Sequence, residues 1–323
     1  MTKLLKYFIL FIIPILVSGI CLFFIPYSRK FAYLNKNNED CNTTWIYYRL
    51  FENSNPIHTA FIGTSHTGCG INDKLIQSIL NTQTANLAYC GGGRNIDYPI
   101  IKDLIETKKP KTVIIELKNQ NDLVHKDYAL MASSFDLFFP PQIPNNYLNN
   151  IYDGFKTRLN LFKNNYFYGP VFENNTTDTF GNILLNNDNQ YIYPHKKYRK
   201  VIFTKNKLGD NSFFEVFKDS MTEQKANDYT QTKQEIRFED INTIKQIVDL
   251  LNKNKVQVRF IYIPSFGNYF KTNMQNSAYA KLAPIIFPPA HLFYNRALWI
   301  DHEHLNANGA KQLSSWLAYY GLN

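Results

Sequence analysis

The pattern of apolar and polar positions begins with one long apolar run. Residues 7–25 (YFILFIIPILVSGICLFFI) contain no charged side chain, and Lys3 and Lys6 precede them. As a helix this run would be roughly 28 Å long, close to the thickness of a bilayer's hydrocarbon core. We therefore expect residues 1–26 to be an uncleaved transmembrane anchor. The alternative is a cleaved signal peptide, but its apolar region is usually only about 7–15 residues and ends at a small-residue cleavage site.

The short N-terminal tail predicts the orientation of this anchor. Basic residues stand on both sides of the run, with Arg29 and Lys30 after it, so the positive-inside rule does not decide. A tail this short favours N-inside insertion. We thus expect a single-pass protein of the inner or plasma membrane, with the rest of the chain facing the periplasm or cell exterior. Residues 27–55 read as a polar linker with a short helix at 42–51.

Beyond residue 56 the pattern changes to short β-favouring runs that alternate with amphipathic segments. The run at 112–117 (TVIIEL) is almost continuously apolar, which is typical of a strand buried on both faces. Alternating strands and helices predict an α/β layer fold around a parallel sheet. Strands are expected at 58–62, 84–87, 112–117 and 256–263, and helices at 73–80, 98–107, 241–252 and 308–319.

An insert interrupts this alternation at about residues 127–235. It is rich in Tyr, Phe, Asn and Lys. The simplest interpretation is a packing subdomain within the domain of residues 56–323. The functional alternatives are an aromatic-lined glycan groove or a docking surface for a membrane partner.

Polar residues that could take part in catalysis follow the predicted strands. Ser65 lies in Gly-Thr-Ser-His after the first strand, Gly91 follows the second, and Asn121 follows the third. Asp301 and His304 stand just before the terminal helix. In parallel sheets, ligands bind beyond the carboxyl ends of the strands, so we expect these residues to meet at one edge.

The residue types in this set suit nucleophilic catalysis. A serine hydroxyl needs an adjacent base, which a carboxylate holds in the correct tautomer. The three-residue offset of Asp301 and His304 allows one turn to present both side chains, so Ser65, Asp301 and His304 are the expected catalytic residues. Backbone N–H groups at Ser65 and in the glycine run 91–93 are natural donors to an oxyanion.

Several competing interpretations concern the same residues. His66 and His302 are rival bases, but only His304 has the three-residue offset from Asp301. A metal site at 301–304 is disfavoured because adjacent side chains diverge and no second ligand pair stands out. Each short motif alone also has an ordinary structural explanation, a turn or a helix cap. The order of the motifs along the chain is what favours a site.

In that order the motifs resemble the conserved blocks of the SGNH (GDSL-type) hydrolase superfamily. FIGTSH resembles the first block, with Thr64 in place of an acidic residue, and NLAYCG resembles the second, with Gly91 as the oxyanion glycine. DHEHLNANGA resembles the last block, D-x-x-H. The third block is where the chain departs: TVIIELKNQND lacks its glycine and places Asn121 one residue late, so Asn121 is either the third oxyanion donor or that donor is missing.

The resemblance implies more than the residues alone. It implies a flavodoxin-like three-layer sheet and an acyl-enzyme formed on Ser65 without a cofactor. The resemblance to membrane-anchored members with similar first blocks implies O-acyl transfer, most simply of acetyl, to a cell-envelope polysaccharide. It also implies a multi-pass acyltransferase of the MBOAT kind as membrane partner. The alternatives are a carbohydrate or lipid esterase with the same triad, and a non-catalytic scaffold that binds glycan or a partner.

Charge and cysteine content add little to this picture. The net charge is +9 with a pI near 9.1, yet the basic residues are scattered apart from 195–200 and no nucleic-acid-binding signature occurs. We therefore expect no nucleic-acid partner. Beyond the anchor stand Cys41, Cys69 and Cys90, an odd number; Cys69 and Cys90 could pair, or all three could be reduced core residues.

Overall fold

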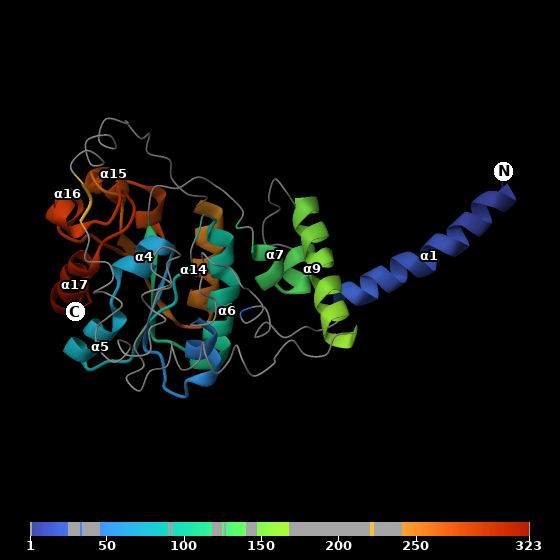
Figure 1. The fold of residues 1–323 in the computed structure, drawn as a ribbon, viewed down its shortest axis with the longest axis horizontal. Helices are drawn as coiled ribbons and strands as arrows, with labels where there is room; N and C mark the ends of the chain where they lie inside the picture. The colour runs from blue at the N-terminus through green and yellow to red at the C-terminus, as the bar shows by residue number, and fades with distance from the viewer. Residues whose placement is uncertain are drawn as a thin grey trace.

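A five-stranded parallel sheet lies at the centre of the structure, a computed structural model (Figure 1). The order is β2-β1-β3-β4-β5, and every neighbouring pair is parallel. The strands are β1 (Thr59–Ile62), β2 (Thr84–Asn86), β3 (Thr112–Leu117), β4 (Gln257–Tyr262) and β5 (Ile285–Ile286). The structure describes residues 2–24, 33, 46–89, 91, 93–117, 125, 127–139, 147–167, 220–222 and 241–322. Asn121, Cys41, Cys90, most of the expected linker and much of the insert lie outside these residues.

The sheet has two buried faces, each with its own hydrophobic core. Alternate strand residues point to opposite sides: Phe61, Ile114 and Ile261 belong to one core and Ile62 and Ile115 to the other. Helices α5 (Asp73–Leu80) and α17 (Ala307–Trp316) contribute to the first core; α6 (Asp97–Lys108) and α14 (Ile241–Lys253) contribute to the second. The three-layer α/β architecture expected from the sequence is confirmed at this level.

The registers of the central strands define where a site can form. β1 is paired to β3 up to Ile62↔Ile115, and β3 to β4 up to Leu117↔Tyr262. The three strands therefore end at one edge, which we call the carboxyl edge. The chain passes from β1 to β2 on one side of β1 and returns to β3 on the other side. In open α/β sheets, ligands bind beyond the carboxyl edge at such a change of direction.

All eight expected strands and helices of the sheet domain are present; two have the expected bounds, and the ends of the others differ by at most three residues. The helix expected at 73–80 matches α5, and the Asn72 side chain caps it by accepting the Leu75 N–H. Strand β2 ends at Asn86 because its side chain turns to bind neighbouring carbonyls. Several short elements were not expected: α4 (Ser65–Gly70), α15 (Lys271–Gln275), α16 (His291–Tyr294), β5, and the 3₁₀ segments Arg94–Ile96, Ala278–Lys281 and Arg296–Leu298. The π segments Tyr48–Glu52 and Leu317–Gly321 overlap the ends of the helices expected at 42–51 and 308–319.

The described part of the insert packs as a small helical unit. It consists of α7 (Tyr128–Met131), α8 (Ser134–Phe138) and α9 (Tyr147–Phe167). A separate apolar cluster joins them, and the buried Arg158 guanidinium donates to the carbonyls of Ala132 and Gly154. This agrees with the packing interpretation for these residues.

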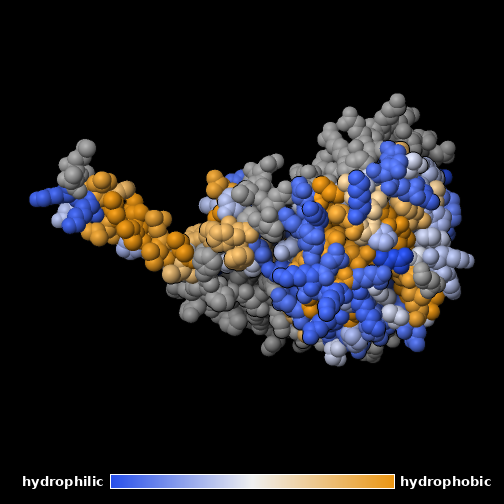
Figure 2. Space-filling view, turned by 180° about the vertical axis from the view of Figure 1, so that it is seen from behind, coloured by the Kyte–Doolittle hydropathy of each residue, from blue (hydrophilic) through white to orange (hydrophobic). Residues whose placement is uncertain are grey.

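The N-terminal segment forms the helix α1 (Thr2–Phe24). Figure 2 shows it as an orange rod that projects from the rest of the molecule, and its large apolar side chains, such as Phe8, Phe11 and Leu16, are exposed. Among the described residues, no helix has both the length and the apolar character that a membrane span requires. The anchor expected at 7–25 is not supported by this finding and stays a prediction.

Candidate active site

Ser65 stands at the first turn after the central strand β1. Helix α4 begins at this serine, and Thr64 is its N-cap, with a side chain that accepts the His66 N–H. The turn lies at the carboxyl edge, because β1 ends at Ile62. Ser65 is partly exposed while the residues around it are buried. The nucleophile predicted from the sequence is therefore presented to solvent by a rigid support.

Ser65, His304 and Asp301 form one continuous hydrogen-bonded relay. The Ser65 Oγ lies 2.9 Å from the His304 Nε2. On the other side of the ring, the His304 Nδ1 lies 3.0 Å from both carboxylate oxygens of Asp301. A carboxylate can only accept, so Nδ1 carries the proton and Nε2 is the acceptor for the serine hydroxyl. The structure thus brings together residues 239 positions apart, in the tautomer that lets histidine act as a general base.

Asp301 is held as an anion by its surroundings. Burial acts to raise its pKa, but the hydrogen bond and charge of His304 and the backbone N–H groups of Glu303 and His304 outweigh it and hold the pKa well below its usual range. Both N–H groups donate to Oδ1 at 2.8 Å. The same carboxylate therefore closes the turn and orients the imidazole.

The loop that carries Asp301 and His304 is closed by backbone pairing at its two ends. Trp299 and Leu305 form an antiparallel bridge, and the Ile300 N–H donates to the His304 carbonyl at 2.9 Å. Asn306 then caps α17 by accepting the Gly309 N–H at 3.0 Å. A Cβ at Gly309 would lie 2.3 Å from the Leu298 carbonyl oxygen, so this position needs glycine. The Leu-Asn-x-x-Gly part of the last block is thus structural: it fixes the loop that presents Asp301 and His304.

Because the Asp301 pKa is lowered in the folded state, Asp301→Asn is expected to change how stability depends on pH. The aspartate has an unfolded pKa of about 3.9, so its stabilising contribution is present above that pH and is lost as pH falls toward the folded pKa. Urea unfolding at pH 7 and pH 3 should show a smaller loss of unfolding free energy in the variant than in the wild-type chain. The side chain is 40% exposed, so the difference should be modest; equal losses in both chains would contradict it.

Two backbone N–H groups, from different loops, are candidate donors to an oxyanion. The Ser65 N–H is the first candidate, since no hydrogen bond among the described residues uses it. Gly91 is the second: it is exposed and has φ +106°, a conformation that side-chain-bearing residues rarely adopt. A Cβ there would lie 2.8 Å from the His125 Nε2. Asn121, the third expected donor, lies outside the described residues.

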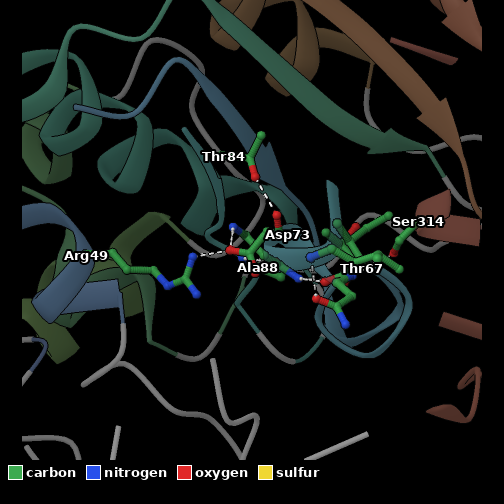
Figure 3. Close-up of polar contacts among 10 residues, drawn as sticks. Arg49, Thr67, Asp73, Thr84, Ala88 and Ser314 are labelled. Atoms are coloured by element: carbon green, nitrogen blue, oxygen red, sulfur yellow. Dashed lines mark hydrogen bonds and ion pairs between the residues drawn. The ribbon is translucent and has the colours of Figure 1, made fainter. Parts of the chain in front are cut away.

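The asparagine that begins the second block has a structural role. The buried Asn86 amide donates to the carbonyls of Thr67 and Ile71 at 2.9 Å each and so holds the far end of α4. Its backbone N–H donates to Asp73 at 2.8 Å, and Arg49 forms an ion pair with the same carboxylate (Figure 3). Asp73 therefore ties β2 to α5 behind the nucleophile turn.

The rival residues occupy other positions. His66 is buried, with its Nδ1 3.2 Å from the Ile263 carbonyl, and its ring lies edge-on to His304 with centroids 5.9 Å apart. It therefore packs against His304, and its Nδ1 is directed away from Ser65. The exposed His302 contributes its carbonyl, which accepts the Phe266 N–H at 2.8 Å.

Cys69 is a buried free thiol whose pKa is raised by burial and by the charge of Asp301, which makes it a poor nucleophile. Among the described residues no cluster of His, Cys, Asp or Glu has the arrangement of a metal site.

Two buried polar residues near the site were not expected from the sequence. Glu116 lies in β3 and accepts hydrogen bonds from the nucleophile turn. His125 lies against Gly91; its Nδ1 accepts the Asp127 N–H at 3.0 Å and its ring meets Tyr89 edge-on. A usable signal existed for Glu116, because a carboxylate inside an otherwise apolar strand needs buried partners.

Comparison with known proteins adds no family. No family model matches the chain, and no curated protein is similar to it at a significant level.

Proposed function

We propose that this chain is a serine O-acyltransferase that transfers an acyl group, most simply acetyl, from a donor ester to a hydroxyl of a cell-envelope polysaccharide. The observation that supports the proposal most directly is the relay from Ser65 Oγ to His304 Nε2 and from His304 Nδ1 to Asp301. The order of the motifs along the chain and the geometry of the relay point to the same three residues. The strand order 2-1-3-4-5 is also the flavodoxin-like order, which supports an SGNH-type assignment.

The first half-reaction forms the acyl-enzyme. Ser65 Oγ attacks the donor carbonyl while His304 Nε2 takes the hydroxyl proton, and Asp301 stabilises the resulting imidazolium. The N–H groups of Ser65 and Gly91 donate to the oxyanion of the tetrahedral intermediate. Its collapse expels the donor's alcohol, which receives the proton from His304. Ser65 is left as an ester.

The second half-reaction decides between transfer and hydrolysis. The acceptor hydroxyl gives its proton to His304 and attacks the acyl carbonyl. The second tetrahedral intermediate collapses, and Ser65 leaves as the free hydroxyl with the proton returned from His304. A sugar hydroxyl as acceptor gives transfer, and water gives the esterase reaction. The proposed setting is the outer side of the membrane, with α1 as anchor and an integral membrane acyltransferase as donor partner; the basic net charge of +9 suits such an anionic envelope.

Trapping the acyl-enzyme tests the proposal. The full chain, incubated with p-nitrophenyl acetate and quenched in acid, should carry one acetyl group on the peptide that contains Ser65, as read by mass spectrometry. Adding a panel of neutral and acidic oligosaccharides should then yield acetylated sugar in excess of free acetate.

Each outcome of this experiment has a distinct meaning. Acetylated sugar supports transfer, whereas an acetyl-Ser65 that decays only to acetate supports the esterase alternative. A chain that never acquires the acetyl group, although it is folded, contradicts both enzymatic functions and favours a binding scaffold.

A further inference from the structure

Glu116 is a buried carboxylate that the acyl-transfer steps do not use. It is fully buried in the central strand β3, and a lone charged group in such a position would be strongly destabilising. Among the described contacts, four hydrogen bonds reach it from two threonines of the nucleophile turn. Thr64 donates its N–H at 2.9 Å and its hydroxyl at 3.0 Å; Thr67 donates its N–H at 3.1 Å and its hydroxyl at 2.5 Å.

These four bonds surround Ser65. Thr64 precedes it and Thr67 follows it by two residues, so the carboxylate binds the turn on both sides of the nucleophile. The remaining N–H groups of this turn are also used: His66 donates to the Thr64 hydroxyl at 3.4 Å and Gly68 to the Thr64 carbonyl at 2.9 Å. Among the described contacts, the Ser65 N–H is the one left for a ligand.

Gly63 makes this arrangement sterically possible. A Cβ at this position would lie 2.4 Å from both the Glu116 Oε2 and the Thr67 Oγ1. No side chain fits there without moving the carboxylate. The glycine of the first block is therefore required for the approach of Glu116, and the threonines on either side of Ser65 supply its donors.

We propose that Glu116 is a positioning residue, which holds the turn so that the Ser65 Oγ meets His304 and the Ser65 N–H faces the oxyanion. This role rests on the function proposed above. It acts through geometry: two backbone donors and two hydroxyls converge on one carboxylate, and a change in any of them lets the nucleophile turn rotate. An error of about 1 Å in such a turn costs about 100-fold in rate.

The charge of Glu116 is not what the role requires. A glutamine can place its carbonyl oxygen where Oε2 accepts the two N–H groups and the Thr67 hydroxyl. Its amide can then donate to the Thr64 hydroxyl, which is able to turn and accept. Glu116→Gln therefore keeps four contacts, whereas Glu116→Ala loses all four and Thr67→Val loses one. These three variants therefore form a series that differs in the number of contacts between residue 116 and the nucleophile turn.

The test compares these variants in the full chain. With p-nitrophenyl acetate we expect kcat to fall about 100-fold in Glu116→Ala and about tenfold in Thr67→Val. We expect KM to stay within a factor of two, because both residues are fully buried. Glu116→Gln should keep at least about a third of the wild-type kcat. The control is Tyr33→Phe, which removes another buried hydrogen bond, 2.9 Å to Asp103, in the core on the opposite side of the sheet from α5 and α17. Tyr33→Phe should lower the unfolding temperature by about as much as Thr67→Val, which also loses one hydroxyl hydrogen bond, and it should leave kcat unchanged.

A second readout separates this inference from the proposed function. A fluorophosphonate probe should label Ser65 in the wild-type chain and label Thr67→Val more slowly. If Thr67→Val is labelled and turns over as fast as the wild-type chain, the positioning role is wrong even if Glu116→Ala fails to fold. If Glu116→Gln is as impaired as Glu116→Ala, the role through geometry is wrong. A folded wild-type chain that is neither labelled nor active overturns the proposed function and this inference with it.

Discussion

Alanine at position 65 is expected to abolish the esterase activity of the chain toward p-nitrophenyl acetate. The hydroxyl that lies 2.9 Å from the His304 Nε2 is the group on which the proposed acyl-enzyme forms. In triads of this kind, removal of the nucleophile lowers kcat by about 10⁴-fold or more. Initial rates of p-nitrophenol release, with the non-enzymatic rate subtracted, measure the loss.

Two controls show whether the loss of activity comes from unfolding or from the removal of any serine at the carboxyl edge. Ser65 is partly exposed at the start of α4, and Thr64 remains as its cap, so Ser65→Ala should unfold at nearly the same temperature as the wild-type chain. Ser265→Ala removes another serine that follows a strand at the carboxyl edge, and it should keep full activity. Activity of Ser65→Ala close to that of the wild-type chain would remove the nucleophile from the proposal.

The sequence predicted the position of Ser65 well because the determinants are local. An apolar run followed by Gly-Thr-Ser marks the end of a buried strand, and the parallel arrangement then brings the ends of β1, β3 and β4 to one edge. Asp301 and His304 were predictable for a similar reason, since a three-residue offset closes a turn by itself. Each of these signals lies within a few residues of the chain.

The support of the site could not be predicted in the same way. Glu116 is 52 residues from Thr64, and its apolar neighbours hide its role until the register of β1 and β3 is known. The closed loop around Asp301 depends on the pairing of Trp299 with Leu305, which no periodic pattern signals. The two-residue strand β5 is too short to leave a pattern at all. Long-range hydrogen bonds, more than propensity, thus decide the details of this site.

Alanine at position 304 is expected to reduce activity nearly as strongly as alanine at position 65. Without the imidazole nothing accepts the Ser65 proton, and Asp301 loses the partner that its carboxylate orients at 3.0 Å. A loss of about 10⁴-fold or more in kcat is expected. The neighbouring His66 cannot substitute, because it is buried and its Nδ1 is directed to the Ile263 carbonyl.

Chemical rescue gives this prediction its sharpest test. Free imidazole can occupy the space left by the side chain. After subtraction of the rate that imidazole gives without enzyme, it should restore part of the activity of His304→Ala and none of that of Ser65→Ala. The matched control is His302→Ala: its exposed ring stands two residues away, while the contact that it makes to the Phe266 N–H uses the backbone carbonyl, so activity should stay within a factor of two. If His302→Ala were instead the inactive variant and His304→Ala the active one, the general base would have been assigned to the wrong histidine, and the relay through Asp301 would have no role in the reaction.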